Sequence, residues 1–340
     1  MSNPRFLVNS SPHYRSKDST TSIMLDVVIA LLPLLGAATI YFGFRALTLS
    51  LVSVGSCIAF ESLFCWITKQ RNTVGDLSAV VTGLLLGLNL PVVTPYWMVV
   101  VGGFFAIVVV KCLFGGLGKN FMNPALAARA FLFSWPSIMT TFTKPFADVY
   151  YTASFVFGEP MFTDGNVSDT VDAITGATTL STLKEGVVPD VDLWDMFVGN
   201  MAGCLGETCT LLILAGLIYL LCRKVISWHI PVCYIGTVAL LTYLFPSGGI
   251  DNLTYMAYEL LSGGLMLGAV FMATDYTTSP LSKTGKIIYA VGCGGLTVLL
   301  RTFGGYPEAV SYSILIMNVA TLALDRYLKP RRYGIGGENV

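Results

Sequence analysis

Long apolar runs, separated by short polar or charged segments, recur along nearly the whole chain. A membrane-spanning helix needs about 20 predominantly apolar residues. Run length predicts ten spans, at residues 24–44, 46–67, 77–92, 96–114, 123–138, 198–221, 226–245, 255–274, 286–303 and 309–328. The fifth is the least regular, because it is short, contains Arg129 and is interrupted by Pro136. We therefore expect an all-α polytopic membrane protein with about ten transmembrane helices.

Composition supports this class. The mean hydropathy is +0.70, and 54% of the residues are hydrophobic. Only 12% are charged, whereas a soluble domain carries roughly a quarter. These values exclude an ordinary soluble domain, and we expect no nucleic-acid partner. Residues 1–23 are polar and basic, without the short apolar core that follows the basic start of a signal peptide, and we interpret them as a cytoplasmic tail.

The Lys and Arg residues indicate the orientation. With the N-terminus inside, fifteen fall in inner segments and four in outer segments, and Arg129 lies within the membrane. The inner ones are Arg5, Arg15, Lys17, Lys69, Arg71, Lys111, Lys119, Arg223, Lys224, Lys283, Lys286, Arg326, Lys329, Arg331 and Arg332, and the outer ones are Arg45, Lys144, Lys184 and Arg301. Cytoplasmic loops of membrane proteins carry such an excess. The bias predicts that both termini are cytoplasmic.

This orientation places one long loop, 139–197, outside. Nine of the twenty acidic residues lie in it: Asp148, Glu159, Asp164, Asp169, Asp172, Glu185, Asp190, Asp192 and Asp195. Long loops in compact proteins are usually functional or disordered. The predicted organisation is a tail (1–23), a first five-helix repeat (24–138), the external loop (139–197), a second five-helix repeat (198–328) and a cytoplasmic tail (329–340).

The two halves contain similar segments. Phe114-Gly115-Gly116 ends the fourth span, and Phe303-Gly304-Gly305 ends the ninth. Because each half has an odd number of spans, the repeats would be inverted relative to each other. Inverted repeats place ligand or ion sites at their interface, often where Gly or Pro breaks a helix. Chance similarity among glycine-rich membrane segments is the alternative.

The most distinctive local sequence in the loop is Asp172-Ala173-Ile174-Thr175-Gly176-Ala177-Thr178-Thr179. Gly176 permits unusual backbone angles, and Gly176 with Ala177 leaves the Thr178 hydroxyl sterically open to a modifying enzyme. A Thr-rich turn, or a helix start capped by Asp172, is the alternative interpretation.

This segment resembles the D-x-x-[ST]-G-A-T flavin-attachment sequence of the RnfD/NqrB family. Residues 119–131, Lys-Asn-Phe-Met-Asn-Pro-Ala-Leu followed by Ala-Arg-Ala-Phe, are similar to a second stretch of that family. Gly206-Glu207-Thr208 and Ala273-Thr274-Asp275 are also similar. The resemblance covers nearly the whole chain. Members of the quinone-reductase branch carry a longer N-terminal extension, so the short tail here favours the RnfD branch.

The resemblance implies two flavins. Thr178 would carry FMN through a phosphoester bond to its hydroxyl, with Asp172, Thr175, Gly176 and Ala177 completing the attachment sequence. A separate flavin transferase would attach it on the outer side. A second, non-covalent flavin, riboflavin or FMN, would lie near the inner side, where Asn120 and Asn123 match the family's positions and are three residues apart. A polar helix start and interhelical packing are the alternative roles of these asparagines.

The resemblance also implies a function. The chain would be an electron-transfer subunit of an Rnf-type ferredoxin:NAD oxidoreductase complex in a bacterial cytoplasmic (inner) membrane, where electron flow drives Na⁺ or H⁺ transport. Its partners would be the other membrane subunits and an external flavoprotein subunit, and it would not be catalytic alone. A secondary transporter with inverted repeats and no redox role is the competing hypothesis. Because a covalent flavin survives denaturation, in-gel fluorescence separates the two.

Charged residues inside the membrane are candidate functional residues by default. Glu61 lies in the second span and Arg129 in the fifth, while Asp275 follows the eighth. These three are candidates for linkage to ion movement, and an Arg129–Asp275 ion pair at similar depth is the structural alternative. Glu207 lies nearer the outer face, where it would meet the covalent flavin. The only two histidines are too far apart in the topology to share a metal.

Overall fold

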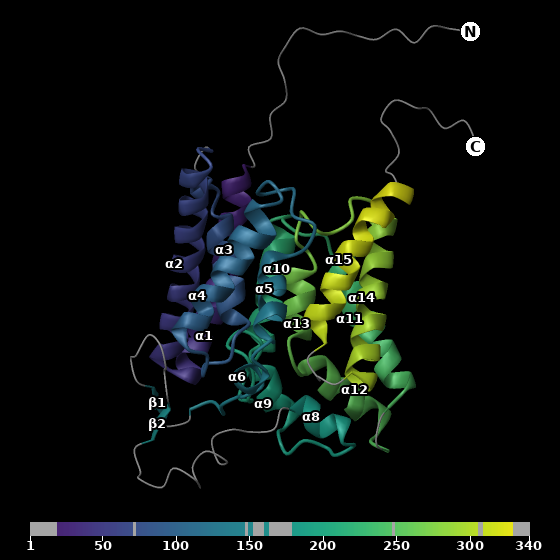
Figure 1. Cartoon of the computed structure of the whole chain (residues 1–340). Coiled ribbons are helices and arrows are strands. Elements are labelled where there is room, and N and C mark those ends of the chain that lie inside the picture. Colours follow the sequence, from purple (N-terminus) through teal and green to yellow (C-terminus); the bar gives the residue numbers. More distant parts are fainter. Residues whose placement is uncertain are drawn as a thin grey trace, which may run out of the picture.

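The computed structural model describes residues 19–70, 73–146, 149–151, 160–162, 179–246, 249–304 and 309–328. These residues form a bundle of helices that run roughly along one direction (Figure 1). The described part contains one short sheet, in which β1 (Val149–Tyr151) pairs antiparallel with β2 (Pro160–Phe162). The predicted all-α membrane fold is confirmed. Of the predicted tails, residues 1–18 and 329–340 lie outside the described residues, whereas residues 20–23, predicted as tail, form the first turn of α1.

The first half runs from a capped helix start into a helical hairpin. The Ser19 side chain accepts a hydrogen bond from the Ser22 N–H at the N-terminus of α1. Gly43, with φ of 77°, is the only residue between α1 and α2. The elements of this half are α1 (Thr20–Phe42), α2 (Phe44–Ile67), the 3₁₀ turn η1 (Val74–Asp76), α3 (Ser78–Leu88), α4 (Tyr96–Phe104), the π-helix η2 (Phe105–Cys112), α5 (Pro124–Leu132) and α6 (Pro136–Met139).

Two short helices precede the second half, and a second π-helix lies within it. The two short helices are α8 (Thr179–Lys184) and α9 (Leu193–Val198). The second half then consists of α10 (Thr210–Cys222), α11 (His229–Leu244), α12 (Asn252–Leu261), α13 (Leu265–Leu267), the π-helix η3 (Gly268–Met272), α14 (Lys283–Phe303) and α15 (Val310–Tyr327). Single π-helical turns are uncommon and frequently lie at functional sites.

Helices occupy all ten predicted spans, but four spans are not continuous. In the third, α3 ends at Leu88, and the fifth is split between α5 and α6. In the sixth, the helix begins only at Thr210. The eighth bends by 64° between α12 and the α13–η3 segment. Non-helical backbone at membrane depth is tolerated where protein surrounds it or a cavity adjoins it.

The count of ten crossings stays a prediction. Among the described helices, α1, α2 and α14 are each long and apolar enough to cross a membrane alone, and α12 with the following segment would make a fourth. The helices α3, α10 and α11 are shorter, as is the combined α4–η2 segment. Broken helices explain the difference at the third, fifth and sixth spans, because each half-helix covers only part of the bilayer thickness, whereas α4–η2 and α11 are unbroken but short.

The arrangement of the ends is consistent with the predicted sidedness. The start of α1 and the end of α15 lie at one end of the bundle, and α8 and α9 lie at the opposite end (Figure 1). We call these the inner and outer ends, following the predicted orientation. Three cations of the charge tally, Arg45, Lys111 and Arg301, are buried in the bundle. Leaving them out changes the predicted bias from fifteen against four to fourteen against two.

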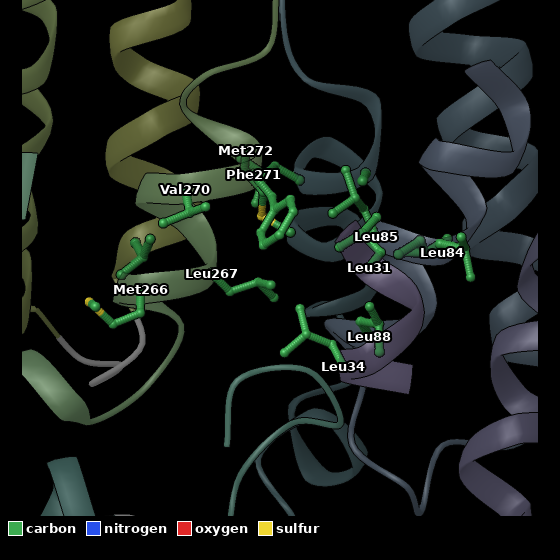
Figure 2. Packing of buried hydrophobic residues seen from close by; sticks show 14 of the residues in the cluster. Leu31, Leu34, Leu84, Leu85, Leu88, Met266, Leu267, Val270, Phe271 and Met272 are labelled. Carbon is green, nitrogen blue, oxygen red and sulfur yellow. The ribbon is translucent and has the colours of Figure 1, made fainter. Parts of the chain in front are cut away.

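The centre of the bundle is apolar and joins the two halves. Figure 2 shows leucines of α1 and α3 on one side, facing the α13–η3 segment on the other. The labelled residues are Leu31, Leu34, Leu84, Leu85, Leu88, Met266, Leu267, Val270, Phe271 and Met272. In lipid, helices associate through close packing rather than through the exclusion of water. This core therefore holds the broken spans at the middle of the molecule.

Candidate functional site

The predicted attachment residues Asp172, Thr175, Gly176, Ala177 and Thr178 lie outside the described residues. The next residue, Thr179, is described and begins α8 at the outer end. The side chains of Thr179 and Leu180 are buried, and that of Leu183 packs in a small cluster. The residues that follow Thr178 are thus packed against the bundle.

A cavity of about 250 Å³ adjoins the start of α8. It is lined by Thr179, Leu180, Met201, Ala202, Gly203, Glu207 and Gly263. The sequence placed Glu207 near the outer face and beside the covalent flavin. In the structure, Glu207 shares this outer cavity with the two residues that directly follow Thr178. Two of the broken spans, the sixth and the eighth, supply the other side of the cavity.

Glu207 forms a buried ion pair with Arg129. The closest distance, between Arg129 Nη1 and Glu207 Oε1, is 2.7 Å, and the residues are 3% and 2% exposed. Arg129 also donates to Asn89 Oδ1 at 2.9 Å and to Cys204 Sγ at 3.4 Å. Glu207 Oε2 has no hydrogen-bond partner among the described residues. A buried carboxylate with an unused oxygen is chemically significant, because burial without a partner costs free energy.

The Arg129–Asp275 ion pair considered from the sequence is wrong. Arg129 points from α5 toward the broken sixth span, whereas Asp275 lies in the turn after η3. The Asp275 carboxylate accepts hydrogen bonds from the hydroxyls of Thr277 and Thr278, at 3.0 and 3.4 Å. Similar depth was the only basis for the predicted pair, and depth does not say which way a side chain points.

Close backbone contacts assemble the Glu207 environment. The Gly206 N–H donates to Leu88 O at 2.7 Å, which joins the sixth span to the end of α3. A Cβ on Gly264 would lie 2.6 Å from Glu207 Oε1. Only a glycine fits between the broken eighth span and the carboxylate at this position. All four discontinuous spans therefore meet at the ion pair, since Arg129 comes from the fifth.

A larger cavity of about 750 Å³ lies toward the inner end. This inner cavity has a largely apolar wall with polar groups converging on it, as ligand sites do. Its polar lining residues are Ser78, Thr82, Lys111, Asn120, Asn123, Thr274, Asp275, Tyr276 and Thr277. It therefore brings Asn120 and Asn123 together with Asp275, which the sequence did not predict.

The two asparagines play different parts in the inner cavity. Asn123 Oδ1 accepts hydrogen bonds from the N–H groups of Ala125 and Leu126 and so caps α5. Asn120 Nδ2 donates to Thr277 Oγ1 at 3.0 Å, but Asn120 Oδ1 is buried without a partner among the described residues. The alternative role of a polar helix start holds for Asn123. Asn120 retains an acceptor available to a ligand.

Lys111 and Glu61 form a second buried ion pair beside the inner cavity. Lys111 Nζ lies 2.9 Å from Glu61 Oε1 and donates to Ser78 Oγ at 2.7 Å. Sequence analysis assigned Lys111 to an inner segment, but the ammonium is buried at the end of η2 and the residue is 2% exposed. Lys111 lies within the apolar run Val108-Val109-Val110-Lys111-Cys112-Leu113, which indicated that it is buried. The charge count nevertheless assigned it to an inner segment.

Sequence analysis also missed a third buried pair. Arg301 Nη1 lies 2.5 Å from Glu259 Oε2, between α14 and α12. Both residues fall within predicted spans, so the default that singled out Glu207 applied equally to them. Among the described residues, no group of three or more His, Cys, Asp or Glu side chains is arranged to hold a metal ion.

Comparison with known proteins identifies the family. Residues 7–334 match the model of the NQR2, RnfD, RnfE family. The chain is 46% identical over 332 residues to the D subunit of the Na⁺-translocating ferredoxin:NAD⁺ oxidoreductase complex of Acetobacterium woodii, and the match covers 96% of this chain and 95% of that protein.

Two further relatives agree. Identity is 38% over 341 residues to the D subunit of the proton-translocating ferredoxin:NAD⁺ oxidoreductase complex of Clostridium ljungdahlii, covering 97% of this chain and 96% of that protein. It is 34% over 346 residues to the D subunit of the ion-translocating oxidoreductase complex of Escherichia coli O7:K1, covering 97% and 98%. The resemblance seen in the sequence is confirmed: this chain belongs to the NQR2, RnfD, RnfE family.

Proposed function

We propose that this chain is the D subunit, a membrane electron carrier, of an ion-translocating ferredoxin:NAD oxidoreductase complex. It carries FMN covalently on Thr178 at the outer end and a second flavin, riboflavin or FMN, without a covalent bond in the inner cavity. The names of the three relatives support the complex and the place of this chain in it. The observation that carries the two-flavin arrangement is the pair of cavities at opposite ends of the bundle.

The inner cavity suits a flavin ring. Asn120 Oδ1 is an acceptor for a ring N–H, and the Lys111 ammonium, which has three N–H donors, is a donor for a ring carbonyl. Of the Lys111–Glu61 pair, only Lys111 lines the cavity, so its ammonium lies on the side where it would favour the added electron on a reduced ring at low dielectric. A bound flavin would supply one- and two-electron redox chemistry, and the surrounding protein would set its potential.

The outer cavity holds the residues adjoining the attachment site. Thr179 and Leu180 anchor the chain directly after Thr178, and Glu207 faces the same space. The Glu207 carboxylate and the Arg129 guanidinium together carry almost no net charge. Their interaction energy changes when another charge is placed beside them. We assign Glu207 the role of a flavin contact at this end.

A continuous set of contacts joins the two cavities. Asn123 Nδ2 donates to Met272 O at 3.3 Å, and Asn89 Nδ2 contacts Met272 Sδ at 3.6 Å. Asn89 Oδ1 in turn accepts from Arg129, which pairs with Glu207. A bilayer core is about 30 Å thick, so a carrier at each end shortens the distance that an electron must cross. We propose that Glu61, Asp275 and Arg129 link the arrival of charge to movement of Na⁺ or H⁺.

The remaining assignments follow from the same proposal. The loop 139–197 is external, where a flavin transferase modifies Thr178 and an external flavoprotein subunit exchanges electrons. Both termini are cytoplasmic, and the other membrane subunits of the complex contact the bundle within a bacterial inner membrane. This chain is one part of the oxidoreductase and does not catalyse the overall reaction alone.

The test is the number and kind of flavins in the purified complex. We expect one flavin of this subunit to remain bound to the denatured polypeptide, where it fluoresces under ultraviolet light. We expect a second flavin to be extractable. Asn120→Ala removes an acceptor of the inner cavity and should remove only the extractable flavin. A wild-type subunit with neither flavin would instead support a transporter without a redox role. A wild type with only the covalent flavin would leave both asparagines as packing residues.

A further inference from the structure

The break in the eighth span exposes backbone groups that need partners. Between Ser262 and Gly264 the chain leaves the helix and bends by 64° into α13. The last carbonyl groups of a helix have no partner within it. At membrane depth each unpaired group costs several kcal/mol, at order of magnitude. A break of this kind persists only if neighbouring side chains satisfy it.

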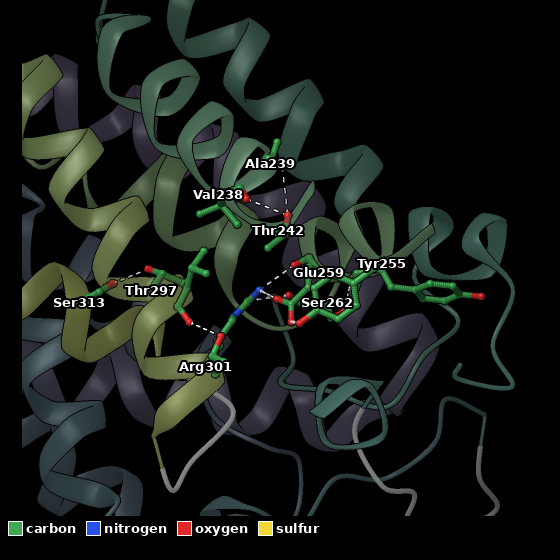
Figure 3. A network of polar contacts seen from close by, with 12 residues as sticks. Val238, Ala239, Thr242, Tyr255, Glu259, Ser262, Thr297, Arg301 and Ser313 are labelled. Atoms are coloured by element: carbon green, nitrogen blue, oxygen red, sulfur yellow. Dashed lines mark hydrogen bonds and ion pairs between the residues drawn. The ribbon is translucent and has the colours of Figure 1, made fainter. Parts of the chain in front are cut away.

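Arg301, in the last turn of α14, supplies those partners. Its Nη1 donates to Glu259 O at 2.7 Å and to Glu259 Oε2 at 2.5 Å, and its Nη2 donates to Ser262 O at 3.1 Å. The Tyr255 hydroxyl donates to the other carboxylate oxygen of Glu259 at 3.2 Å. Figure 3 shows the guanidinium pointing into the break. The planar fork of an arginine suits several acceptors at once.

The break provides the surface against which α8 packs, and we call the contact between Gly263 and Leu180 the seat of α8. Gly263 has φ of +63°, and a Cβ there would lie 2.6 Å from Leu180 Cδ1 and 3.4 Å from Arg301 Nη2. Leu180 therefore fits against backbone at a position without a side chain, and it is 3% exposed. One turn later, Leu183 packs with Tyr255 and Tyr258 of α12.

A further contact fixes the other end of α8. The Lys184 ammonium donates to Gly304 O, directly after α14. The helix is only six residues long, so its own hydrogen bonds hold it weakly. Its position is set by the break and by α14 rather than by the helix itself.

We propose that Arg301, Gly263 and Leu180 are positioning residues that hold α8, the helix that directly follows Thr178 in the chain, beside the outer cavity. This inference rests on the proposed attachment of FMN to Thr178. Arg301 keeps the break open, the break accepts Leu180, and the seated helix keeps the covalent flavin at a constant distance from the next redox centre. None of the three residues needs to touch the flavin.

The corresponding residue of the first half supports this role. Lys111 lies three residues before Phe114-Gly115-Gly116, and Arg301 lies two residues before Phe303-Gly304, so the two cations are similarly but not identically placed. Lys111 bonds Ser78, the first residue of α3, beside the inner cavity. In each half, a buried cation near the end of one span thus holds a half-helix next to a cavity.

The first experiment introduces Gly263→Ala in the complete complex, because the added methyl group occupies the space that Leu180 fills in the wild type. We expect unchanged amounts of covalent flavin on denaturing gels, because this substitution leaves the attachment sequence intact. Hydrogen exchange of the α8 amides should rise by about tenfold or more, because exchange reports local opening. Electron transfer through the complex should fall, because misplacement of reacting groups by about 1 Å can cost up to about 10²-fold in rate.

Gly249→Ala is the matched control. Gly249 also has positive φ, of 73°, but an added Cβ there would meet no atom within 4 Å. It therefore carries the same backbone strain without disturbing Leu180, and it should leave both exchange and electron transfer at wild-type values. Leu180→Ala keeps the glycine and empties the seat, so it should reproduce the Gly263→Ala result even if that variant folds poorly.

Wild-type exchange of α8 in both Gly263→Ala and Leu180→Ala would overturn the inference. Faster exchange with wild-type electron transfer would also overturn it, because the seat would then not position the flavin. Failure of the proposed function is separate: it would appear as absence of covalent flavin from the unmodified protein. The hydrogen-exchange comparison does not depend on the flavin and still tests whether the break seats α8.

Discussion

Among the described residues, buried acidic and basic side chains form ion pairs that join different helices or segments. The three most buried pairs are Glu61–Lys111, Glu207–Arg129 and Glu259–Arg301. Removing one partner of such a pair leaves an uncompensated charge and typically costs about 3–5 kcal/mol. Two of the pairs adjoin a cavity, and the third holds open the helix break beside the outer one. The same residues therefore affect both stability and charge at the proposed flavins.

The attachment residue is tested by Thr178→Ala. Because only Thr178 has the terminal position of the motif, this substitution should abolish covalent fluorescence while leaving the subunit in the membrane. Thr175→Ser keeps both the Thr178 hydroxyl and a residue that the motif allows at its Ser/Thr position, and it serves as the control. Fluorescence on denaturing gels is the measurement. Covalent flavin retained by Thr178→Ala would show that another residue carries it.

The Arg129 pairing is tested by comparing Arg129→Ala with Asp275→Asn. Arg129→Ala leaves the Glu207 carboxylate buried without its cation and should destabilise the protein by about 3–5 kcal/mol. Asp275→Asn keeps a side chain that can bond Thr277 and should change stability by less than about 1 kcal/mol. Thermal unfolding in detergent measures both. Equal losses would contradict the observed partners.

Helices of this protein approach closely at glycines. The α2 and α3 helices pack where a Cβ on Gly83 would lie 2.6 Å from Val54 Cα, which is backbone and cannot rotate away. At Gly216, on α10, a Cβ would lie 2.9 Å from the ring of Phe271. Small residues at such crossings permit the van der Waals packing that drives association in lipid.

Gly83→Val should separate α2 from α3. Forcing a side chain into packed backbone costs about 1–3 kcal/mol, and the unfolding temperature should fall accordingly. Gly55→Val lies on α2 next to Val54, but a Cβ there meets no atom within 4 Å. This control should be close to neutral. Similar unfolding temperatures for the two variants would rule out a tight α2–α3 contact at Gly83.

At the scale of the whole molecule, the broken spans divide the bundle into two ends. The inner cavity is lined by α1, α3 and the residues around α5, and the outer cavity by α8 and the broken sixth and eighth spans. Between them lies the apolar core of Figure 2 and the Arg129 cluster. Two sites held at a fixed separation suit transfer of charge across the membrane.

Sidedness is tested by cysteine labelling. A cysteine replacing Gly165 in the 139–197 loop should react with a membrane-impermeant maleimide in intact cells. A cysteine replacing Lys283, at the exposed start of α14, should react only after permeabilisation. Native Cys222 is exposed and is replaced by serine in both. The reverse pattern would invert the topology and remove the external location from the flavin-attachment proposal.

The sequence alone allowed the membrane class, the family and the helix positions to be predicted. Apolar run length decides where a helix lies in a bilayer, because the lipid core requires an apolar segment that satisfies its own backbone. The attachment motif and the Asn120–Asn123 segment could also be recognised, because each is a continuous stretch of sequence. The ion pairs were not predictable, because nothing local tells Arg129 to face Glu207 rather than Asp275.

Local sequence by itself determined the spans, the orientation bias and the resemblance, since each depends on composition or on neighbouring residues. Only the tertiary structure decided that four spans are broken, that Lys111 and Arg301 are buried, and that Glu207 shares a cavity with Thr179. These features arise where segments distant in the chain meet. Which backbone groups go unpaired, and which side chain reaches them, depends on packing geometry rather than on any one stretch of sequence.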